Sequence, residues 1–504
     1  MNRAFAELKH RLAEVWDLRV ASWLLEWDQE VTMPRGGAAV RPEQLATLER
    51  VAHERFTAAE IGRLLDELQP YEERLDPDSD EASLIRVARR DWEKARRVPA
   101  ELRGDLMHAA ATGYEVWVQA RERSDFALFL PTLQRNLELK HRYIECFDGL
   151  ETPYDALLDD YEEGMTTAEV TEVLMHLRDG LVPLMAEIAH HGDPVDASFL
   201  AGPFPVDRQR RVERAILDRV GFDEESWRLD EIVHPAAYAF ATSDVRISTR
   251  YSESSLETLF SVLHEFGHGL YERQVSPALE RTPLASGVSL GVHEAQSRLW
   301  ENVVGRGLPF WRHFYPLLQE EFPERLGDVS LNAFYRAVNR VAPSLIRVDA
   351  DEVTYNLHVI LRFELERELF DGGVEPRELP EAWNGRISHY LGIDVPDDAR
   401  GVLQDSHWSG GGFGYFPTYS LGNVLSVQLW ERLRGDVPGL DDEIERGEFG
   451  SLRDWLREHV HRHGRKFTPR ETVARAAGRA LDPEPYLGYL REKFAEIYGL
   501  SARR

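Results

Sequence analysis

The most informative stretch of this chain is His264-Glu265-Phe266-Gly267-His268, within residues 254–273, which we predict to form a helix. Residues four apart share one face of a helix, so the two imidazoles can converge on one metal ion. Glu265 lies about 100° round the helix from His264, close enough to accept a proton from a water molecule at that ion. The H-E-x-x-H spacing therefore predicts a helical zinc site.

A catalytic zinc site usually has three protein ligands and one open position, so a third donor is expected. Glu272 follows His268 by four residues. It stands about 12 Å along the helix axis from His264, too far to share an ion with both histidines. The third ligand must therefore come from another segment.

Residues 282–292 contain a proline and two glycines and are predicted to be a loop, followed by a second helix at residues 293–301. A carboxylate near the start of that helix can fold back onto the first helix. Glu294 is our preferred third ligand. Its neighbour His293 is the competing donor, and an ordinary polar helix end is the remaining alternative.

The rest of the chain indicates a large, mainly α-helical enzyme. Apolar residues recur with a helical period, for example at residues 174–184 and 357–369. Residues 245–251 are the exception and alternate as a strand, with Arg246 on one face and Val245 and Ile247 on the other. The 504 residues contain no linker or repeat, so we predict a single domain over residues 1–504.

Composition excludes several classes of partner. The formal charge of −28 disfavours binding to nucleic acid, because the phosphate backbone would be repelled. Cys146 is the only cysteine, so an intrachain disulfide is impossible. No apolar run approaches membrane-spanning length, and residues 1–12 do not resemble a signal peptide. A cytoplasmic location is the default expectation.

Five further stretches match motifs of one known family. They are residues 24–34 (LLEWDQEVTMP), 244–249 (D-x-R-x-x-T), 293–298 (HEAQSR, with alanine where the family has serine), 346–351 (I-R-x-x-A-D), and 401–417, with G-x-x-Q-D-x-H-W followed by G-Y-F-P. Together with H-E-x-x-H, these stretches make the chain resemble the carboxypeptidase Taq family of zinc metallocarboxypeptidases nearly end to end. The resemblance implies a two-lobed helical body with a deep substrate groove, zinc at its floor, a small antiparallel β-sheet beside the zinc helix and usually a homodimer. It also implies that Co²⁺ can replace Zn²⁺.

The residue types predict a hydrolytic mechanism. Zn²⁺ would be held by His264, His268 and Glu294, with Glu265 as the general base. The tetrahedral intermediate needs an additional donor for its oxyanion. His407 and Tyr415 are our candidates, because the glycines at residues 410–412 allow a close approach to a ligand. Tyr419 is the alternative to Tyr415, and a purely structural role is possible for both candidates.

Removal of a C-terminal residue requires a cation for the terminal carboxylate of the substrate. Arg347 is our choice, since a guanidinium binds a carboxylate through two hydrogen bonds and the I-R-x-x-A-D match marks this position. The alternative is a structural salt bridge with Asp351 or with another acid. His358 and Arg362 on the same predicted helix, and Arg246 and Arg250 on the strand, are weaker candidates for substrate binding.

We therefore predict a zinc carboxypeptidase that releases single C-terminal residues from peptides with broad specificity. The closest alternative is a zinc oligopeptidase of the thimet type, which also has an H-E-F-G-H helix and a distal glutamate. A peptide-binding protein without catalytic activity is a third hypothesis, disfavoured by the complete set of ligands and base.

Overall fold

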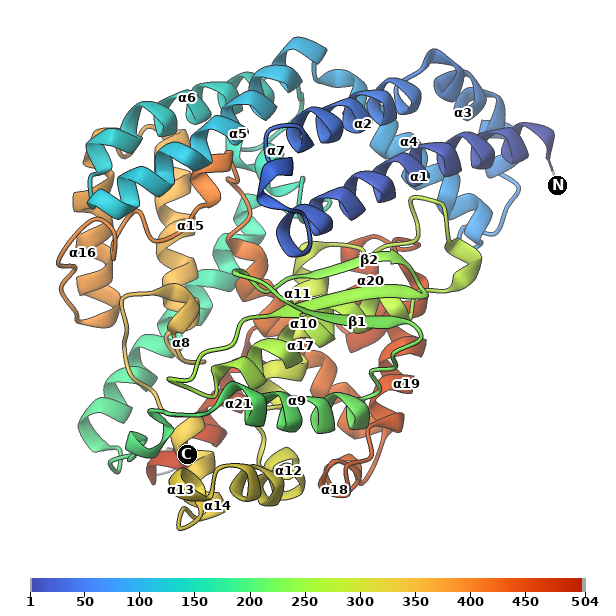
Figure 1. Cartoon of the computed structure of the whole chain (residues 1–504). Coiled ribbons are helices and arrows are strands. Elements are labelled where there is room, and N and C mark those ends of the chain that lie inside the picture. Colours follow the sequence, from blue (N-terminus) through green and yellow to red (C-terminus); the bar gives the residue numbers. More distant parts are fainter. Residues whose placement is uncertain (1, 501–504) are drawn as a thin grey trace.

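The computed structural model describes residues 2–500, which form a mostly helical body with one small sheet (Figure 1). Long helices make up the N-terminal part, drawn in blue to cyan: α1 (Arg3–Val31), α2 (Arg41–Phe56), α3 (Ala59–Glu72), α4 (Asp80–Arg97), α5 (Ala100–Arg123) and α6 (Phe126–Ile144). The prediction of a mainly helical fold is confirmed.

The remaining helices are α7 (Pro153–Leu158), α8 (Thr167–His191), α9 (Val206–Val220), α10 (Glu257–Arg273), α11 (Leu290–Arg298), α12 (Leu308–Glu321), α13 (Pro323–Leu326), α14 (Leu331–Val338), α15 (Tyr355–Asp371), α16 (Leu379–Leu391), α17 (Pro417–Asp436), α18 (Leu440–Glu445), α19 (Gly450–His459), α20 (Pro469–Ala477) and α21 (Glu484–Tyr498). A π-helical turn, Leu299–Val304, continues α11. The helices predicted at residues 254–273 and 293–301 therefore correspond to α10 and to α11 with its π-helical extension.

The sheet has three strands, β1 (Trp227–Glu231), β2 (Ala237–Ala241) and β3 (Asp244–Thr249), with β3 in the centre. β3 runs antiparallel to β2 but parallel to β1. The expected antiparallel sheet is therefore mixed. The order of the strands explains this: β3 lies between β1 and β2. The chain reverses direction between β1 and β2 and again between β2 and β3, so β3 runs in the same direction as β1.

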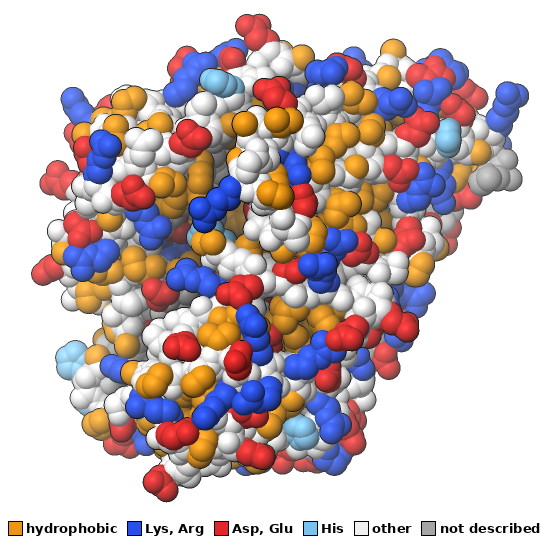
Figure 2. All heavy atoms as spheres, viewed as in Figure 1, with side chains coloured by type: hydrophobic (Ala, Val, Ile, Leu, Met, Phe, Trp, Pro, Cys, Tyr) orange, Lys and Arg blue, Asp and Glu red, His pale blue; other side chains and the backbone are white. Residues whose placement is uncertain are grey.

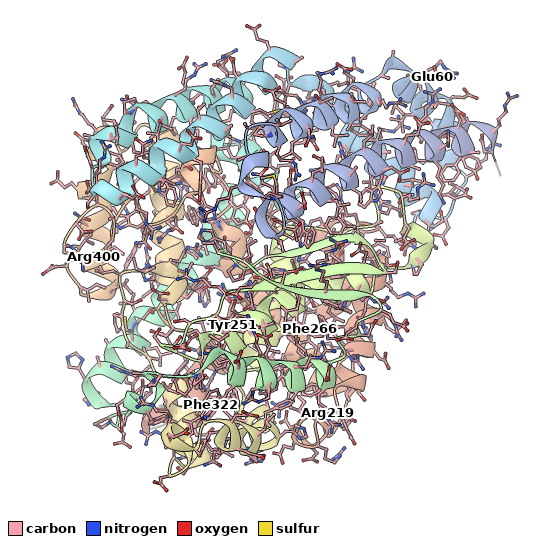
Figure 3. All side chains as sticks on the ribbon, viewed as in Figure 1. Glu60, Arg219, Tyr251, Phe266, Phe322 and Arg400 are labelled. Carbon is pink, nitrogen blue, oxygen red and sulfur yellow. The ribbon has the colours of Figure 1, made fainter. Side chains whose placement is uncertain are left out.

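The sheet packs on α10 through the apolar face of β3. Val245 and Ile247 have no exposed surface, in agreement with the predicted alternation. Phe266, from the centre of the H-E-F-G-H motif, is labelled in Figure 3. It stacks on Trp227 of β1 with ring centroids 5.3 Å apart. This packing fixes the rotation of α10, so the histidines four residues apart face away from the sheet.

α17 joins two hydrophobic cores. Its residues Leu421, Val424 and Val427 pack into a core with α15, α16 and α21. Leu425 and Leu429 belong to a second core with α10, α12 and the sheet. Residues 420–429 of α17 are all buried, so this helix contacts both cores. This continuity supports the single domain over residues 1–504, which stays a prediction.

The space-filling view shows a hollow in the drawn face, beside the loop that joins α1 and α2 (Figure 2). The two-lobed form and the deep groove expected from the family resemblance stay predictions. Among the helices of residues 2–500, none combines the length and the apolar character needed to cross a membrane.

Candidate metal centre

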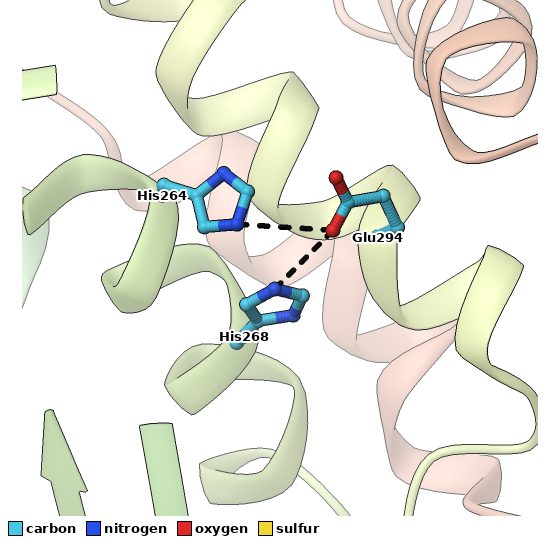
Figure 4. Close-up of side chains that lie close together, drawn as sticks. All are labelled: His264, His268 and Glu294. Atoms are coloured by element: carbon cyan, nitrogen blue, oxygen red, sulfur yellow. Dashed lines mark ion pairs between the residues drawn. The ribbon is translucent and has the colours of Figure 1, made fainter. Parts of the chain in front are cut away.

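Three potential metal ligands converge from two helices (Figure 4). His264 and His268 lie on α10, and Glu294 lies on α11. The Oε2 atom of Glu294 is 3.7 Å from Nε2 of His264 and 3.4 Å from Nε2 of His268. One ligand atom from each residue lies within 4.8 Å of the other two. The three residues predicted as a zinc site are therefore grouped in space.

The close approach of α11 to α10 depends on Gly267, between the two histidines. A Cβ atom at this position would lie 2.5 Å from the carbonyl oxygen of Gln296 and 2.7 Å from Cα of Ser297. Any larger residue would push α11 away and move Glu294 off the histidines. The start of α11 is set by Ser289, whose hydroxyl accepts the N–H of Val292.

A second layer of side chains holds the ligands. Nδ1 of His264 lies 2.8 Å from the carboxylate of Glu301, so it donates a hydrogen bond and leaves Nε2 for the metal. Arg298 donates to Glu294 at 2.7 Å and to Glu301 at 3.0 Å. Ser297 also donates to Glu294, at 3.1 Å. Arg298 thus holds the two carboxylates, one on each side of His264, in place.

His268 is oriented through two further residues. Its Nδ1 lies 2.7 Å from Nδ1 of His293, and Nε2 of His293 lies 2.8 Å from the carboxylate of Glu272. His293 is therefore behind His268 and outside the ligand group, as is Glu272, the donor that we excluded on distance. His293, which we had considered as a competing metal ligand, instead makes a hydrogen bond to the ligand His268. Its ring faces α10 one turn beyond the metal centre, at Glu272.

Replacing His293 with alanine is expected to weaken the binding of a divalent ion by about 10- to 100-fold, since His268 loses the acceptor that orients its ring. The dissociation constant can be measured by competition with a fluorescent zinc chelator. His313→Ala is the control, because this ring contacts the carbonyl of Glu445 in another part of the molecule. Metal affinity within twofold of the wild type would contradict the orienting role.

The charges at the centre fit a divalent ion. Burial lowers the pKa of His268 to about 3, so this ring is neutral and able to bind a metal. Burial opposes charge on Glu294, but Arg298 and the two histidines lower its pKa below the usual range. Burial also lowers the pKa of His264, but Glu294 and Glu301 outweigh this effect and raise it. Two imidazoles and a carboxylate are a donor set typical of catalytic zinc.

Glu265 lies beside the ligand group on α10. Burial raises the pKa of its carboxylate to about 7, with a smaller lowering by His264. Across the described residues, we find no hydrogen bond or ion pair to this carboxylate. A buried glutamate with a pKa near neutrality can both accept and release a proton, as a general base must.

Arg347 lies in a 3₁₀ turn (Arg347–Asp349), eight residues before the start of α15, so it is not on the helix with His358 and Arg362 as predicted. Between the turn and α15, the carboxylate of Asp351 accepts the N–H groups of Val353 and Thr354, just before the start of the helix. Asp351 does not pair with Arg347, so this form of the salt-bridge alternative is wrong, whereas the other form, a pair with another acid, is present in the structure.

The acid that pairs with Arg347 is Asp405, at 2.8 Å. Asp405 also binds Arg362, at 2.6 Å. Both guanidinium groups lower the pKa of Asp405 far below its usual range, against the effect of burial. Two arginines share a single carboxylate, so the cluster keeps a net positive charge.

Among the other candidates for substrate binding, two residues, His358 and Arg362, are fully buried, and Arg246 is partly exposed. His358 and Arg362 have no exposed surface, and Arg362 also donates to Gln404 at 2.8 Å. Arg362 lies against Asp405, and neither residue lines an open surface. Arg246 on β3 pairs with Asp244 and stacks on Trp27, with 4.2 Å between its guanidinium carbon and the ring centroid.

His407 and the two candidate tyrosines form one aromatic cluster. The ring centroids of His407 and Tyr415 are 5.2 Å apart, and Nε2 of His407 lies 3.1 Å from the hydroxyl of Tyr419. Burial lowers the pKa of His407 to about 4, so the ring is neutral. Burial, and then the charge of Glu294, raise the pKa of Tyr415 to about 12, so its hydroxyl stays protonated and able to donate.

Tyr355, at the start of α15, connects the metal centre to Arg347, and sequence reasoning missed it. Arg298 stacks on its ring at 4.3 Å, and its hydroxyl accepts a hydrogen bond from Arg347 at 3.0 Å. No spacing rule marks this residue. Arg298 could have been found, because it lies four residues after Glu294 on a predicted helix.

Comparison with known proteins places this arrangement in one family. A model of the carboxypeptidase Taq (M32) metallopeptidases matches residues 7–494. The chain is 43% identical to thermostable carboxypeptidase 1 of Thermus thermophilus, over 94% of this chain and 95% of that protein. It is 37% identical to carboxypeptidase 1 of Bacillus subtilis, with the same two coverages.

Solved carboxypeptidase structures have the same fold as this chain. The M32 carboxypeptidase of Deinococcus radiodurans superposes with a TM-score of 0.94 at 41% identity, over 99% of this chain and all of that one. A carboxypeptidase of Pyrococcus furiosus gives 0.95 at 35% identity, over 98% of this chain and 99% of that one. The chain belongs to the carboxypeptidase Taq (M32) metallopeptidase family.

Proposed function

We propose that this protein is a zinc carboxypeptidase that releases single residues from the C-terminus of peptides. The observation that carries the proposal is the convergence of His264, His268 and Glu294 beside Glu265. A divalent ion held by these ligands supplies Lewis acidity, which polarises a carbonyl and lowers the pKa of water. Zn²⁺ is our choice, and Co²⁺ suits the same donors.

Glu265 is proposed to accept a proton from the attacking water and to pass it to the leaving amine. Its position next to His264 on α10 and its pKa of about 7 support this role. The proton returns to the amine nitrogen as the peptide bond breaks, so the carboxylate is restored at the end of each cycle.

Tyr415 is proposed to donate a hydrogen bond to the developing oxyanion. Its hydroxyl carries a proton at neutral pH, because burial and then the charge of Glu294 raise its pKa, and this influence of Glu294 supports the assignment. Neutral His407 is the second proposed donor. Its Nε2 already faces the Tyr419 hydroxyl, so Tyr415 is the stronger of the two assignments.

Arg347 is proposed to bind the terminal carboxylate of the substrate. Asp405 receives its Nε and Nη2 donors and Tyr355 its Nη1 donor, which leaves two of the five guanidinium N–H groups for a ligand. The net positive charge shared with Arg362 favours a second carboxylate beside Asp405. Arg246 remains a secondary candidate at the sheet.

The family resemblance supports four further proposals: broad residue specificity, a homodimer, a cytoplasmic location and a single domain over residues 1–504. Peptides with a free C-terminus are the proposed partners. The thimet-type oligopeptidase is disfavoured, because the family match covers residues 7–494 and the relatives are carboxypeptidases.

Mass spectrometry of a peptide ladder tests the proposal, with metal-loaded protein and with protein stripped by a chelator. We expect stepwise loss of single C-terminal residues, abolished by the chelator and restored by Zn²⁺. A C-terminally amidated copy of the peptide is the control and is expected to resist cleavage. Internal fragments, or cleavage of the amidated peptide at the same rate, would overturn the carboxypeptidase assignment.

A further inference from the structure

The carboxylate of Glu366 on α15 binds two other segments of the chain in the interior, α7 and residues 407–415. It accepts hydrogen bonds from the Tyr154 hydroxyl at 2.6 Å, from Nε1 of Trp408 at 2.7 Å and from the N–H of Gly414 at 2.9 Å. The side chain has no exposed surface. Within residues 2–500 it forms no ion pair. Burying a carboxylate without a cation raises the free energy of the folded state, and the hydrogen bonds that the carboxylate accepts offset this effect.

Two of these donors flank the proposed oxyanion donors. Trp408 follows His407, and Gly414 precedes Tyr415. One carboxylate thus holds both ends of residues 407–415, a segment that contains only a short 3₁₀ turn (His407–Gly410). With little regular structure of its own, this segment depends on outside contacts for its shape.

Gly414 leaves little room for any other arrangement. It has φ +87°, and a Cβ atom there would lie 2.6 Å from the backbone of Leu157 at the end of α7. The backbone of Gly414, just before Tyr415, therefore packs directly against α7, and the N–H of Gly414 donates to Glu366.

The same region of the chain reaches the metal centre. Tyr161, three residues after α7, packs against the ring of Tyr415 with centroids 5.1 Å apart. Its carbonyl oxygen accepts the N–H of Leu290, the first residue of the helix that carries Glu294. Neighbouring Glu162 accepts the N–H of Gly291. The segment after α7 therefore contacts both Tyr415 and α11.

We propose that Glu366 is a positioning residue, which holds Gly414 and Trp408 so that the hydroxyl of Tyr415 is placed against the metal centre. This inference rests on the proposed function, in which Tyr415 donates to the oxyanion. Glu366 itself touches no reacting atom. Its two oxygens accept three hydrogen bonds, whereas a glutamine would present an NH₂ group to at least one of these donors.

The test is Glu366→Gln, made in the wild type and in a Tyr415→Phe background, with kcat and KM measured on one peptide. We expect kcat to fall at least about tenfold in the wild type and less than about threefold in the Tyr415→Phe background, because the two residues act through one group. KM and the bound zinc should stay unchanged. Glu364→Gln is the matched control: it lies two residues before Glu366 on α15, and its carboxylate accepts a hydrogen bond from Tyr390 outside the site.

Equal losses of kcat in the two backgrounds, or full activity of Glu366→Gln or of Tyr415→Phe, would overturn the positioning role. A wild type without any carboxypeptidase activity would overturn the proposed function itself. If Glu366→Gln fails to fold, Trp408→Phe removes one of the three hydrogen bonds and tests the same coupling. Its loss of kcat must also shrink in the Tyr415→Phe background.

Discussion

Glu265→Gln is expected to lower kcat by about 10²- to 10⁴-fold, the range measured for the loss of a general base. The amide has nearly the shape of the carboxylate but cannot accept a proton and pass it on. Zinc content should be unchanged, because His264, His268 and Glu294 are retained. Steady-state kinetics on a peptide with a free C-terminus, together with metal analysis of the same samples, measure both quantities.

Glu257→Gln is the control for this substitution. Glu257 is on the first turn of the same helix, and its carboxylate is exposed and pairs with Arg306. Its replacement should leave kcat within about twofold, as for most surface changes. Unchanged turnover by Glu265→Gln would remove Glu265 as the base, and lost zinc in that variant would make the residue part of the binding site instead.

Arg347→Lys is expected to lower kcat/KM by about 10²- to 10³-fold on peptides with a free C-terminus. Lysine keeps the positive charge but lacks the planar set of guanidinium N–H donors that can bind Asp405, Tyr355 and a substrate carboxylate at the same time. The informative measurement is the ratio of kcat/KM for a free peptide to that for its amide. We expect this ratio to fall towards one in the variant.

The ratio separates recognition of the substrate from structural support. If Arg347 serves only its ion pair with Asp405, the substitution lowers Tm and activity on both peptides equally, and the ratio stays as in the wild type. Arg340→Met is a suitable control, because Arg340 is an exposed arginine in the loop that leads to Arg347. An unchanged ratio in Arg347→Lys would contradict the proposed contact with the terminal carboxylate.

Local spacing predicted the elements around the metal correctly. His264 and His268 share a face because they are four residues apart on a helix, and this holds wherever the helix lies. The axial distance excluded Glu272, which the structure places behind His293. The strand at β3 followed in the same way from its alternation of apolar and polar residues.

Contacts between distant segments were not predictable from spacing. Asp405 was quoted within a family motif but had no assigned partner, and it binds Arg347 across 58 residues of chain. The parallel pairing of β1 with β3 depends on which side of β3 the intervening strand occupies. The Arg347–Asp405 pair and the order of the strands depend on how the whole core packs, and a local sequence pattern carries no information about that packing.

Residue types and their spacing are enough to predict the chemistry of the site: two histidines and a glutamate as candidate ligands, a glutamate beside them, and helices that carry them. How these groups are held depends on contacts between segments that are distant in the chain. The tertiary structure sets His293 and Glu301 behind the two histidines, connects Arg298 to Arg347 through Tyr355, and joins Glu366 to Gly414, the residue before Tyr415. The physical reason is range: helical periodicity acts over a few residues, whereas a buried hydrogen bond or ion pair depends on segments brought together when the apolar cores form.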